Sequence, residues 1–277
     1  MTQPELPPLR EVIRRHGLAA KRSLGQHFLL DHKLTARIAR AAGDLTGCSV
    51  IEIGPGPGGL TRSLLAAGAR VVVAVEKDPR CIEALAELAA LNPQRLTIIQ
   101  ADALGLDTAA IAEPPRCIVA NLPYNIAVPL LLGWLRRIEE IRSLTLMFQK
   151  EVADRLLAGP GDPAYGRLSV ITQWLAEVRF EFNVDARAFT PPPKVTSAVV
   201  SLLPRPQPLA PSPFSALERV TAAAFGQRRK MLRGSLKALG IDPEAAGIAA
   251  TRRGEELSVQ EFCALARLLP AQATTAG

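Results

Sequence analysis

Short apolar runs alternate with helical segments in the first half of the chain, and this alternation constrains the fold more than any other feature. The runs are SVIEI (49–53), RVVVAVE (70–76), RLTIIQ (95–100), RCIVA (116–120) and SLTLMFQ (143–149). They have the length and apolar content of buried strands. The pattern predicts an α/β fold, a Rossmann-like domain whose parallel sheet has helices on both faces. Ligands of such sheets bind beyond the carboxyl ends of the strands.

The following segments are expected to continue this sheet. RLSVITQWL (167–175), EVRFEFNV (177–184) and TSAVVSLL (196–203) are interpreted as sheet, and FTPPPKV (189–195) as a loop between the last strands. PRPQPLAPSP (204–213) has five prolines in ten residues, which sustain neither helix nor sheet and indicate a stiff linker.

The linker suggests a division into two domains. We expect the Rossmann-like domain, with a basic N-terminal segment, over residues 1–207 and a smaller helical, RNA-binding domain over 208–277. Within the second domain, segments 214–239 and 258–268 are expected to be helical.

Charge and cysteine usage limit the class of protein. The chain of 277 residues carries 33 Lys and Arg against 26 Asp and Glu, which favours an anionic partner, with nucleic acid ahead of membrane. Its four cysteines form no C-x-x-C pair and its three histidines no H-E-x-x-H motif, so we expect no metal site and a reducing, cytoplasmic location. No run approaches the roughly 18 apolar residues of a membrane span.

Glycines cluster directly after the first strand, in EIGPGPGGLT (52–61). Gly54, Gly56 and Gly59 satisfy the G-x-G-x-x-G pattern of dinucleotide-binding domains, so an NAD-dependent enzyme is one interpretation. Glu76 ends the second strand about twenty residues later, where a carboxylate can accept hydrogen bonds from both ribose hydroxyls. The alternative for Glu76 is a solvated residue at a strand end.

Asp102, in QADAL (100–104), follows the third strand. Its carboxylate can accept a hydrogen bond from an adenine amine, although Asp is also a common helix cap. Three consecutive strand ends with a glycine loop, a Glu and an Asp form one row along the sheet edge. This row suits an adenosine-containing ligand.

NLPYN (121–125) follows the fourth strand, next to that row. Asn and Pro are ordinary turn residues, and a simple turn is the alternative interpretation. A dehydrogenase needs an acid or base at this place, whereas Asn121 offers an amide oxygen, Leu122 a backbone carbonyl and Tyr124 an aromatic face. Two acceptors and a stacking ring suit the exocyclic amine of a base, which they can aim at an electrophile.

Taken together, these motifs resemble the ribosomal RNA adenine dimethyltransferase family over nearly the whole chain. The motifs that carry the resemblance are KRSLGQHFL, EIGPGPGGLT, VEKD, QADAL, NLPYN, LMFQKEVADRL, YGRLSV, FTPPPKVTSAVV and FGQRRKMLRGSL. The last is similar to the small-subunit (16S) branch. The resemblance implies S-adenosylmethionine as cofactor and dimethylation of two adjacent adenosines near the 3′ end of 16S rRNA. It also implies an immature small ribosomal subunit as partner and a monomeric enzyme.

The resemblance also implies roles for individual residues. The expected cofactor contacts are Gln26, His27, Leu29, Gly54, Gly56, Glu76, Asp102 and Asn121. Position 27 is often Asn in the family, which leaves open whether the His27 ring or only its backbone makes the contact; a half-buried polar residue is the alternative. The expected catalytic residues are Asn121, Leu122, Tyr124 and Phe189, with no strong general base. Phe189 is expected to meet the target base opposite Tyr124, with an ordinary core Phe as the alternative.

Basic residues of the second domain are expected to bind RNA. On a single helix over 222–240, Leu232, Leu236 and Leu239 would share one face and Arg229, Arg233 and Lys237 the adjacent one, thickened by Arg228 and Lys230. Phosphate contact is also expected for Lys194. Solvated surface is the alternative for all of these cations.

Two other classes of protein share parts of this pattern. A non-catalytic RNA-binding assembly or transcription factor with this fold would be expected to lose NLPYN or the glycine loop, and both are intact. A DNA adenine methyltransferase more often carries a D-P-P-Y type of motif.

Overall fold

The computed structural model describes residues 6–21 and 24–269 and divides the chain into two compact units. Unit 1 contains Met1–Ala153 and Arg179–Pro204, and unit 2 contains Asp154–Val178 and Arg205–Gly277. This division differs from the expected boundary at 207/208, because residues 154–178 cluster with the C-terminal segment. Arg22 and Ser23, in the motif KRSLGQHFL, lie outside the described residues.

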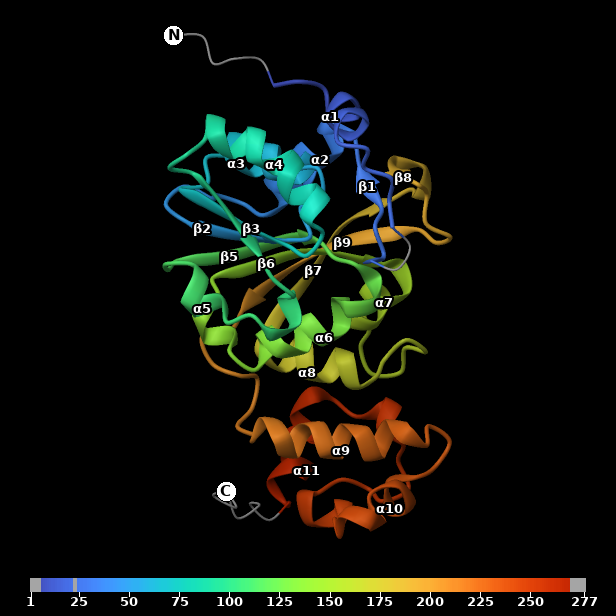
Figure 1. Cartoon of the computed structure of the whole chain (residues 1–277). Helices are drawn as coiled ribbons and strands as arrows, with labels where there is room; N and C mark the ends of the chain where they lie inside the picture. Colours follow the sequence, from blue (N-terminus) through green and yellow to red (C-terminus); the bar gives the residue numbers. More distant parts are fainter. Residues whose placement is uncertain (1–5, 22–23, 270–277) are drawn as a thin grey trace. The chain divides into compact units, whose positions relative to one another are not determined.

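A seven-stranded sheet forms the centre of the fold, in the order β4-β3-β2-β5-β6-β9-β7 (Figure 1). Its strands are β2 (Ser49–Ile53), β3 (Val71–Glu76), β4 (Leu96–Gln100), β5 (Arg116–Asn121), β6 (Ser143–Gln149), β7 (Ala176–Val184) and β9 (Ser197–Pro204). The strands from β4 to β6 are parallel, and β9 is antiparallel to β6. The expected Rossmann-like α/β fold is confirmed.

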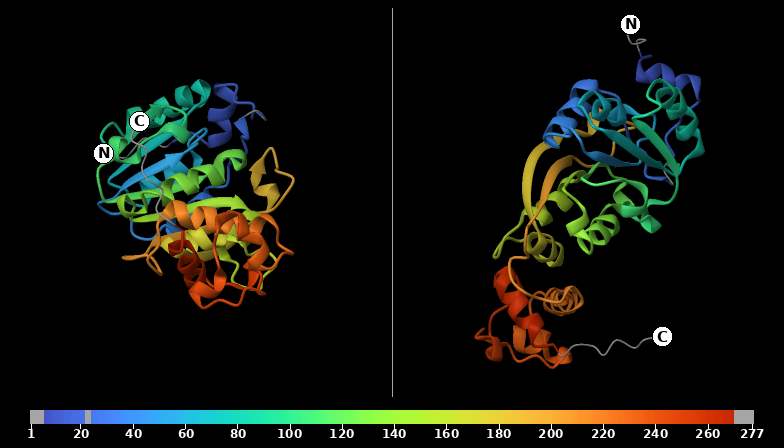
Figure 2. Two further views of the ribbon diagram at one scale, coloured as in Figure 1. Left: turned by 90° about the horizontal axis from the view of Figure 1, so that it is seen from below. Right: turned by 90° about the vertical axis from the view of Figure 1, so that its left-hand side faces the viewer.

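Helices cover both faces of this sheet, as the apolar character of its central strands requires. The helices α2 (His32–Ala41), α3 (Gly59–Ala66) and α4 (Pro79–Leu91) lie on one face, and α5 (Thr108–Ile111) and α6 (Tyr124–Leu135) on the other (Figures 1 and 2). All five residues of β2 are buried. The chain proceeds outward from β2 in one direction and from β5 in the other. The switch point between them is where such sheets bind ligands.

The N-terminal segment crosses this edge of the sheet. After α1 (Leu9–Arg15), the two-residue strand β1 (Phe28–Leu29) pairs antiparallel with β8 (Phe189–Thr190), and the two lie side by side in Figure 1. The pairing brings KRSLGQHFL next to FTPPPKV, although the two are far apart in the sequence.

Unit 2 contains α8 (Arg167–Leu175), α9 (Phe214–Gly226), α10 (Leu232–Ser235) and α11 (Val259–Arg267). The prediction that 167–175 belongs to the sheet was wrong. Val170, Ile171, Trp174 and Leu175 follow a helical spacing and are buried. The Trp174 ring lies 5.9 Å from the Phe214 ring, and its indole nitrogen donates to the Ala210 carbonyl at 2.8 Å. These contacts join α8 to the C-terminal helices.

The prediction of a single helix over 222–240 was also wrong. Helix α9 ends at Gly226, and the backbone N–H groups of Leu232 and Arg233 donate to the carbonyls of Arg252 and Ala250 rather than to a preceding helical turn. Arg229, Arg233 and Lys237 therefore do not form a stripe along one helix.

The remaining elements are short. They are α7 (Lys150–Leu157) and the 3₁₀ turns Ala103–Gly105, Ile138–Glu140, Ala186–Ala188, Lys237–Leu239, Pro243–Ala246 and Gly254–Glu256. Among the described residues, the helices are all too short or too polar to cross a membrane.

Candidate active site

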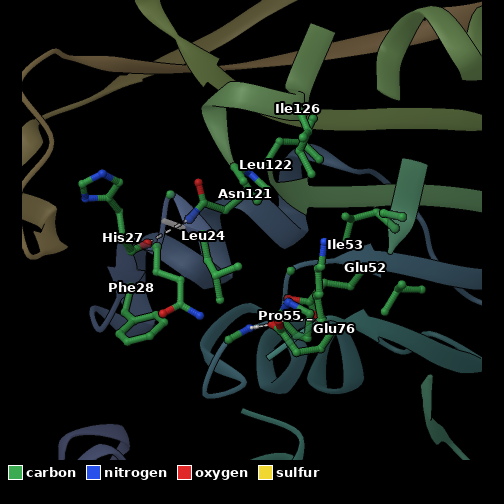
Figure 3. A pocket seen from close by; sticks show the side chains of 18 of the residues that line it. Leu24, His27, Phe28, Glu52, Ile53, Pro55, Glu76, Asn121, Leu122 and Ile126 are labelled. Atoms are coloured by element: carbon green, nitrogen blue, oxygen red, sulfur yellow. Dashed lines mark hydrogen bonds between the residues drawn. The ribbon is translucent and has the colours of Figure 1, made fainter. Parts of the chain in front are cut away.

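A cavity of about 180 Å³ opens at the switch point of the sheet (Figure 3). The carboxyl ends of β2, β3 and β5 line it together with the N-terminal segment. The residues predicted as cofactor contacts all lie on its wall, as do Leu122 and Tyr124. Phe189, Lys194 and the basic residues of unit 2 do not line this cavity.

The glycine loop lies tightly under the N-terminal segment. A Cβ atom at Gly59 would lie 2.6 Å from the backbone oxygen of Leu29, and one at Gly56 would lie 3.1 Å from the Phe28 ring. Gly56 also has a positive φ of 55°. Only glycine combines a positive φ with such close approach, so a side chain at these positions would displace the N-terminal segment.

Glu76 accepts three hydrogen bonds from backbone N–H groups at the end of β3. Lys77 and Asp78 donate to its Oε1 at 2.8 Å, and Gly56 donates to its Oε2 at 3.1 Å. Burial raises the pKa of Glu76, opposed by these hydrogen bonds. A carboxylate offers about four lone-pair positions. Glu76 is therefore oriented, and it retains room for a hydroxyl partner.

Asp102 is a cap of the turn that follows it, the alternative weighed for it, and it also pairs with a lysine. Its Oδ1 accepts from the N–H of Leu104, so Asp102 caps the following 3₁₀ turn. Its Oδ2 lies 2.8 Å from the Lys77 ammonium. The hydrogen bond from Lys77 lowers the pKa of Asp102. Lys77 was not among the predicted site residues, although it follows Glu76 directly in the sequence.

The Gln26 side chain binds to protein groups at the wall of the cavity. Its Nε2 donates to Asp78 Oδ2 at 3.0 Å, and its Oε1 accepts from the N–H of Lys21 at 2.8 Å. Asp78 also pairs with Arg80 at 2.7 Å, and mainly this interaction holds the Asp78 pKa at about 2. Gln26 therefore fastens the N-terminal segment to the end of β3.

Glu52 is a cavity residue that the sequence reasoning missed. It lies in β2, is 1% exposed, and accepts a 2.6 Å hydrogen bond from the Thr61 hydroxyl. Burial raises its pKa to about 8, and the nearby Glu76 carboxylate also raises it. A carboxylate within the apolar run SVIEI was the available signal, because such residues are seldom buried without a function or a partner.

Asn121 ends β5 with a defined amide orientation. Its Nδ2 lies 3.3 Å from the backbone oxygen of His27. A carbonyl only accepts hydrogen bonds, so the amide nitrogen points to His27 and Oδ1 remains an acceptor (Figure 3). The neighbouring Leu122 is 2% exposed.

Aromatic groups surround the end of β5. The Tyr124 ring lies 5.8 Å from the His27 imidazole and nearly parallel to it, and the Phe189 ring meets the imidazole edge-on at 6.4 Å. Tyr124 also shares a 2.6 Å hydrogen bond with Ser197, and burial raises its pKa. Phe189 is 3% exposed and belongs to the core cluster, as the alternative of a core Phe predicts, and its contact with this site is the edge-on one with His27.

The predicted RNA-binding residues of unit 2 are exposed, but one has structural contacts. Arg228 donates to the carbonyls of Pro163 and Tyr165 at 2.8 and 2.6 Å. Arg229 and Lys230 are exposed in the turn after α9, Arg233 on α10 and Lys237 in the following 3₁₀ turn. In unit 1, Lys194 is exposed as well.

The Rossmann-like sheet, the glycine loop, the Glu76 carboxylate at the end of β3 and the oriented Asn121 amide at the end of β5 define an S-adenosylmethionine-dependent methyltransferase. The description "Ribosomal RNA adenine dimethylase" belongs to a family model that matches residues 17–270. The chain therefore belongs to the ribosomal RNA adenine dimethylase family and is an rRNA adenine dimethyltransferase.

Two curated relatives match almost end to end. A protein of Paramagnetospirillum magneticum is 66% identical over 271 residues, covering 97% of this chain and 96% of its own. A protein of Rhodospirillum rubrum is 64% identical over 270 residues, covering 96% and 93%. Both are named ribosomal RNA small subunit methyltransferase A.

Two solved structures share the fold. A dimethyladenosine transferase from Plasmodium falciparum has a TM-score of 0.75 at 25% identity, covering 86% of this chain and 96% of its own. The 23S rRNA methyltransferase ErmE has a TM-score of 0.66 at 30% identity, covering 87% and 99%.

Proposed function

We propose that this enzyme dimethylates the exocyclic amines of two adjacent adenosines near the 3′ end of 16S rRNA, as a step of ribosome biogenesis. The observation that carries the chemistry is the orientation of Asn121, whose Nδ2 is bound to His27 and whose Oδ1 remains an acceptor. The small-subunit names of the relatives at 66% and 64% identity support the choice of RNA.

The cavity residues fit S-adenosylmethionine. Glu76 would accept from the ribose hydroxyls, Asp102 from the adenine amine, and the backbone at Gly54 and Gly56 would allow close approach. Gln26, His27 and Leu29 would close the N-terminal segment over the cofactor. The bound cofactor supplies an electrophilic methyl group.

Asn121 and Leu122 would position the attacking amine. The lone pair of an adenine amine is delocalised into the ring, which makes the amine a poor nucleophile. Two acceptors, Asn121 Oδ1 and the Leu122 carbonyl, favour a pyramidal nitrogen and fix its direction. Tyr124 and Phe189 would contact the base after it leaves its stack and recover part of the unstacking cost. The amine becomes acidic as it is methylated, so no strong base is required.

The substrate is proposed to be rRNA within an immature small subunit, bound by a monomeric, cytoplasmic enzyme. RNA phosphates would be bound by exposed cations, namely Lys194, Arg229, Lys230, Arg233 and Lys237. Arg228 would support this surface, because its guanidinium donates to the backbone carbonyl of Pro163.

Methyl transfer to undermethylated small subunits tests the proposal. Labelled methyl groups should enter small subunits and appear as dimethyladenosine after nuclease digestion, with less transfer to naked RNA and none to duplex DNA. Equal labelling of DNA, or label in any nucleoside other than adenosine, would contradict the proposed function.

A further inference from the structure

The His27 imidazole connects two parts of the target-base site. Its Nδ1 lies 2.7 Å from the backbone oxygen of Pro191, two residues after Phe189. Because a carbonyl oxygen only accepts, Nδ1 carries the proton and donates it. The side chain is thereby tied to the FTPPPKV loop. In Figure 3 the ring points away from the labelled residues of the glycine loop.

The same residue contacts the groups that surround the target base. Its ring lies nearly parallel to Tyr124 and edge-on to Phe189, with centroid separations of 5.8 and 6.4 Å. Its backbone oxygen accepts from Asn121. His27 therefore faces the cofactor cavity with its backbone and the target-base site with its side chain.

We propose that His27 is a positioning residue for the target base, whose hydrogen bond to Pro191 holds Phe189 at a fixed separation from Tyr124 and matters most for the second methyl transfer. The inference rests on the proposed dimethylation and adds a residue to it. It moves the His27 side chain from the expected cofactor contacts to the substrate side.

The reason for a larger effect on the second transfer is a count of hydrogen bonds. An unmodified amine has two N–H groups for the two acceptors, Asn121 Oδ1 and the Leu122 carbonyl. After one methylation a single N–H remains, so one acceptor no longer holds the amine. The orientation of the base then depends more on the rings of Tyr124 and Phe189, whose separation His27 controls.

Two substitutions that are nearly isosteric with each other isolate the hydrogen bond, since both remove the imidazole ring. Asn places an N–H donor where histidine has Nδ1, whereas ionised Asp has the same shape and only acceptors. We expect His27→Asn to retain most of the second transfer. We expect His27→Asp to slow it by about tenfold to a hundredfold, because small displacements of a reacting group cost rate on this scale. The readout is the ratio of N6-monomethyl to N6,N6-dimethyladenosine in small-subunit RNA over time.

A second pair keeps the test decisive if the Asp variant folds poorly. His27→Phe retains a ring beside Tyr124 without the donor, and His27→Ala has neither. Both should accumulate monomethyladenosine. Calorimetric affinity for S-adenosylmethionine should match the parent in every folded variant, because the backbone contact is unchanged. His32→Ala, an exposed histidine on α2, is the matched control and should behave as the parent.

The outcomes separate the two proposals. If the parent enzyme forms no dimethyladenosine, the proposed function fails. If the parent does form it and the Asp, Phe and Ala variants give the parental product ratio, His27 has no positioning role. Loss of cofactor affinity in these variants, with an unchanged product ratio, would return the side chain to the cofactor site.

Discussion

The Thr61 hydroxyl donates a 2.6 Å hydrogen bond to the Glu52 carboxyl group. Burial raises the pKa of Glu52 to about 8, so this group stays largely protonated below that pH. An unfolded chain releases this proton near pH 4.5. Between these values the unfolded state binds fewer protons than the folded one, so the contribution of Glu52 to stability is complete below pH 4.5 and is lost as the pH rises towards 8.

Glu52→Gln should therefore flatten the pH dependence of stability. The loss attributable to Glu52 between pH 4.5 and pH 8 is about 4 kcal/mol, and the variant should lack it. Urea unfolding at several pH values measures the difference. Glu83→Gln, which removes an exposed carboxylate from α4, should leave the parental slope. Parallel pH curves for Glu52→Gln and the parent would show that Glu52 ionises normally.

Glu76→Ala should weaken S-adenosylmethionine binding by roughly 1 to 3 kcal/mol, because the ribose loses a charged hydrogen-bond acceptor. The backbone N–H groups of Gly56, Lys77 and Asp78 lose theirs too, so thermal unfolding should first establish that the variant is folded. Unchanged affinity in calorimetry would remove Glu76 from the cofactor site.

Gly59→Ala should reduce cofactor affinity by displacing the N-terminal segment. The new Cβ would lie 2.6 Å from the Leu29 oxygen, which belongs to backbone and cannot rotate away. A loss of about tenfold in affinity is expected if the closing segment shifts. Gly105→Ala is the matched control, because no atom lies within 4 Å of its Cβ position. Equal affinities for the two variants would show that this closure is dispensable.

Asn121→Ala and Tyr124→Ala should abolish methyl transfer while the fold and RNA affinity persist, because these side chains orient the amine and the base. Tyr124→Phe keeps the ring and loses only the hydrogen bond to Ser197, so it should retain most activity. Single-turnover rates and filter binding separate the two effects. Parental turnover in either alanine variant would disprove the amine clamp.

Replacing Arg229 and Arg233 with Gln should weaken RNA binding and flatten its dependence on salt. Each lost phosphate contact reduces the slope by roughly one unit, because fewer counterions are released. The exposed side chains around α10 support this expectation even though they do not share one helix face. Arg267→Gln removes the same charge from α11 and is the control. A double variant with the parental slope would indicate a merely solvated surface.

The sequence predicted the sheet well because its strands are short, apolar and separated by helices, a pattern fixed by local periodicity. Part of the cavity wall was also predictable, because Glu76 and Asn121 end strands and Asp102 comes shortly after one. The pairing of β1 with β8 was not, because two-residue strands carry no periodicity and their partners are distant in the sequence.

The errors in the later segments have physical causes as well. RLSVITQWL mixes apolar and polar residues over only nine positions, so its pattern fits a strand as well as a helix, and packing against Phe214 decides. The predicted helix does not continue beyond Gly226, because the backbone N–H groups of Leu232 and Arg233 donate to carbonyls of a loop distant in the sequence. The hydrogen bonds of Gln26 and His27 likewise depend on tertiary contacts.

The β1–β8 pairing has a thermodynamic consequence. It couples Leu29, whose backbone lies over the glycine loop, to Phe189, whose ring meets His27 edge-on, through a shared backbone ladder. A ligand that orders either strand lowers the entropic cost of ordering the other. Cofactor and target adenosine should thus bind cooperatively, and linkage requires that each increase the affinity for the other by the same factor.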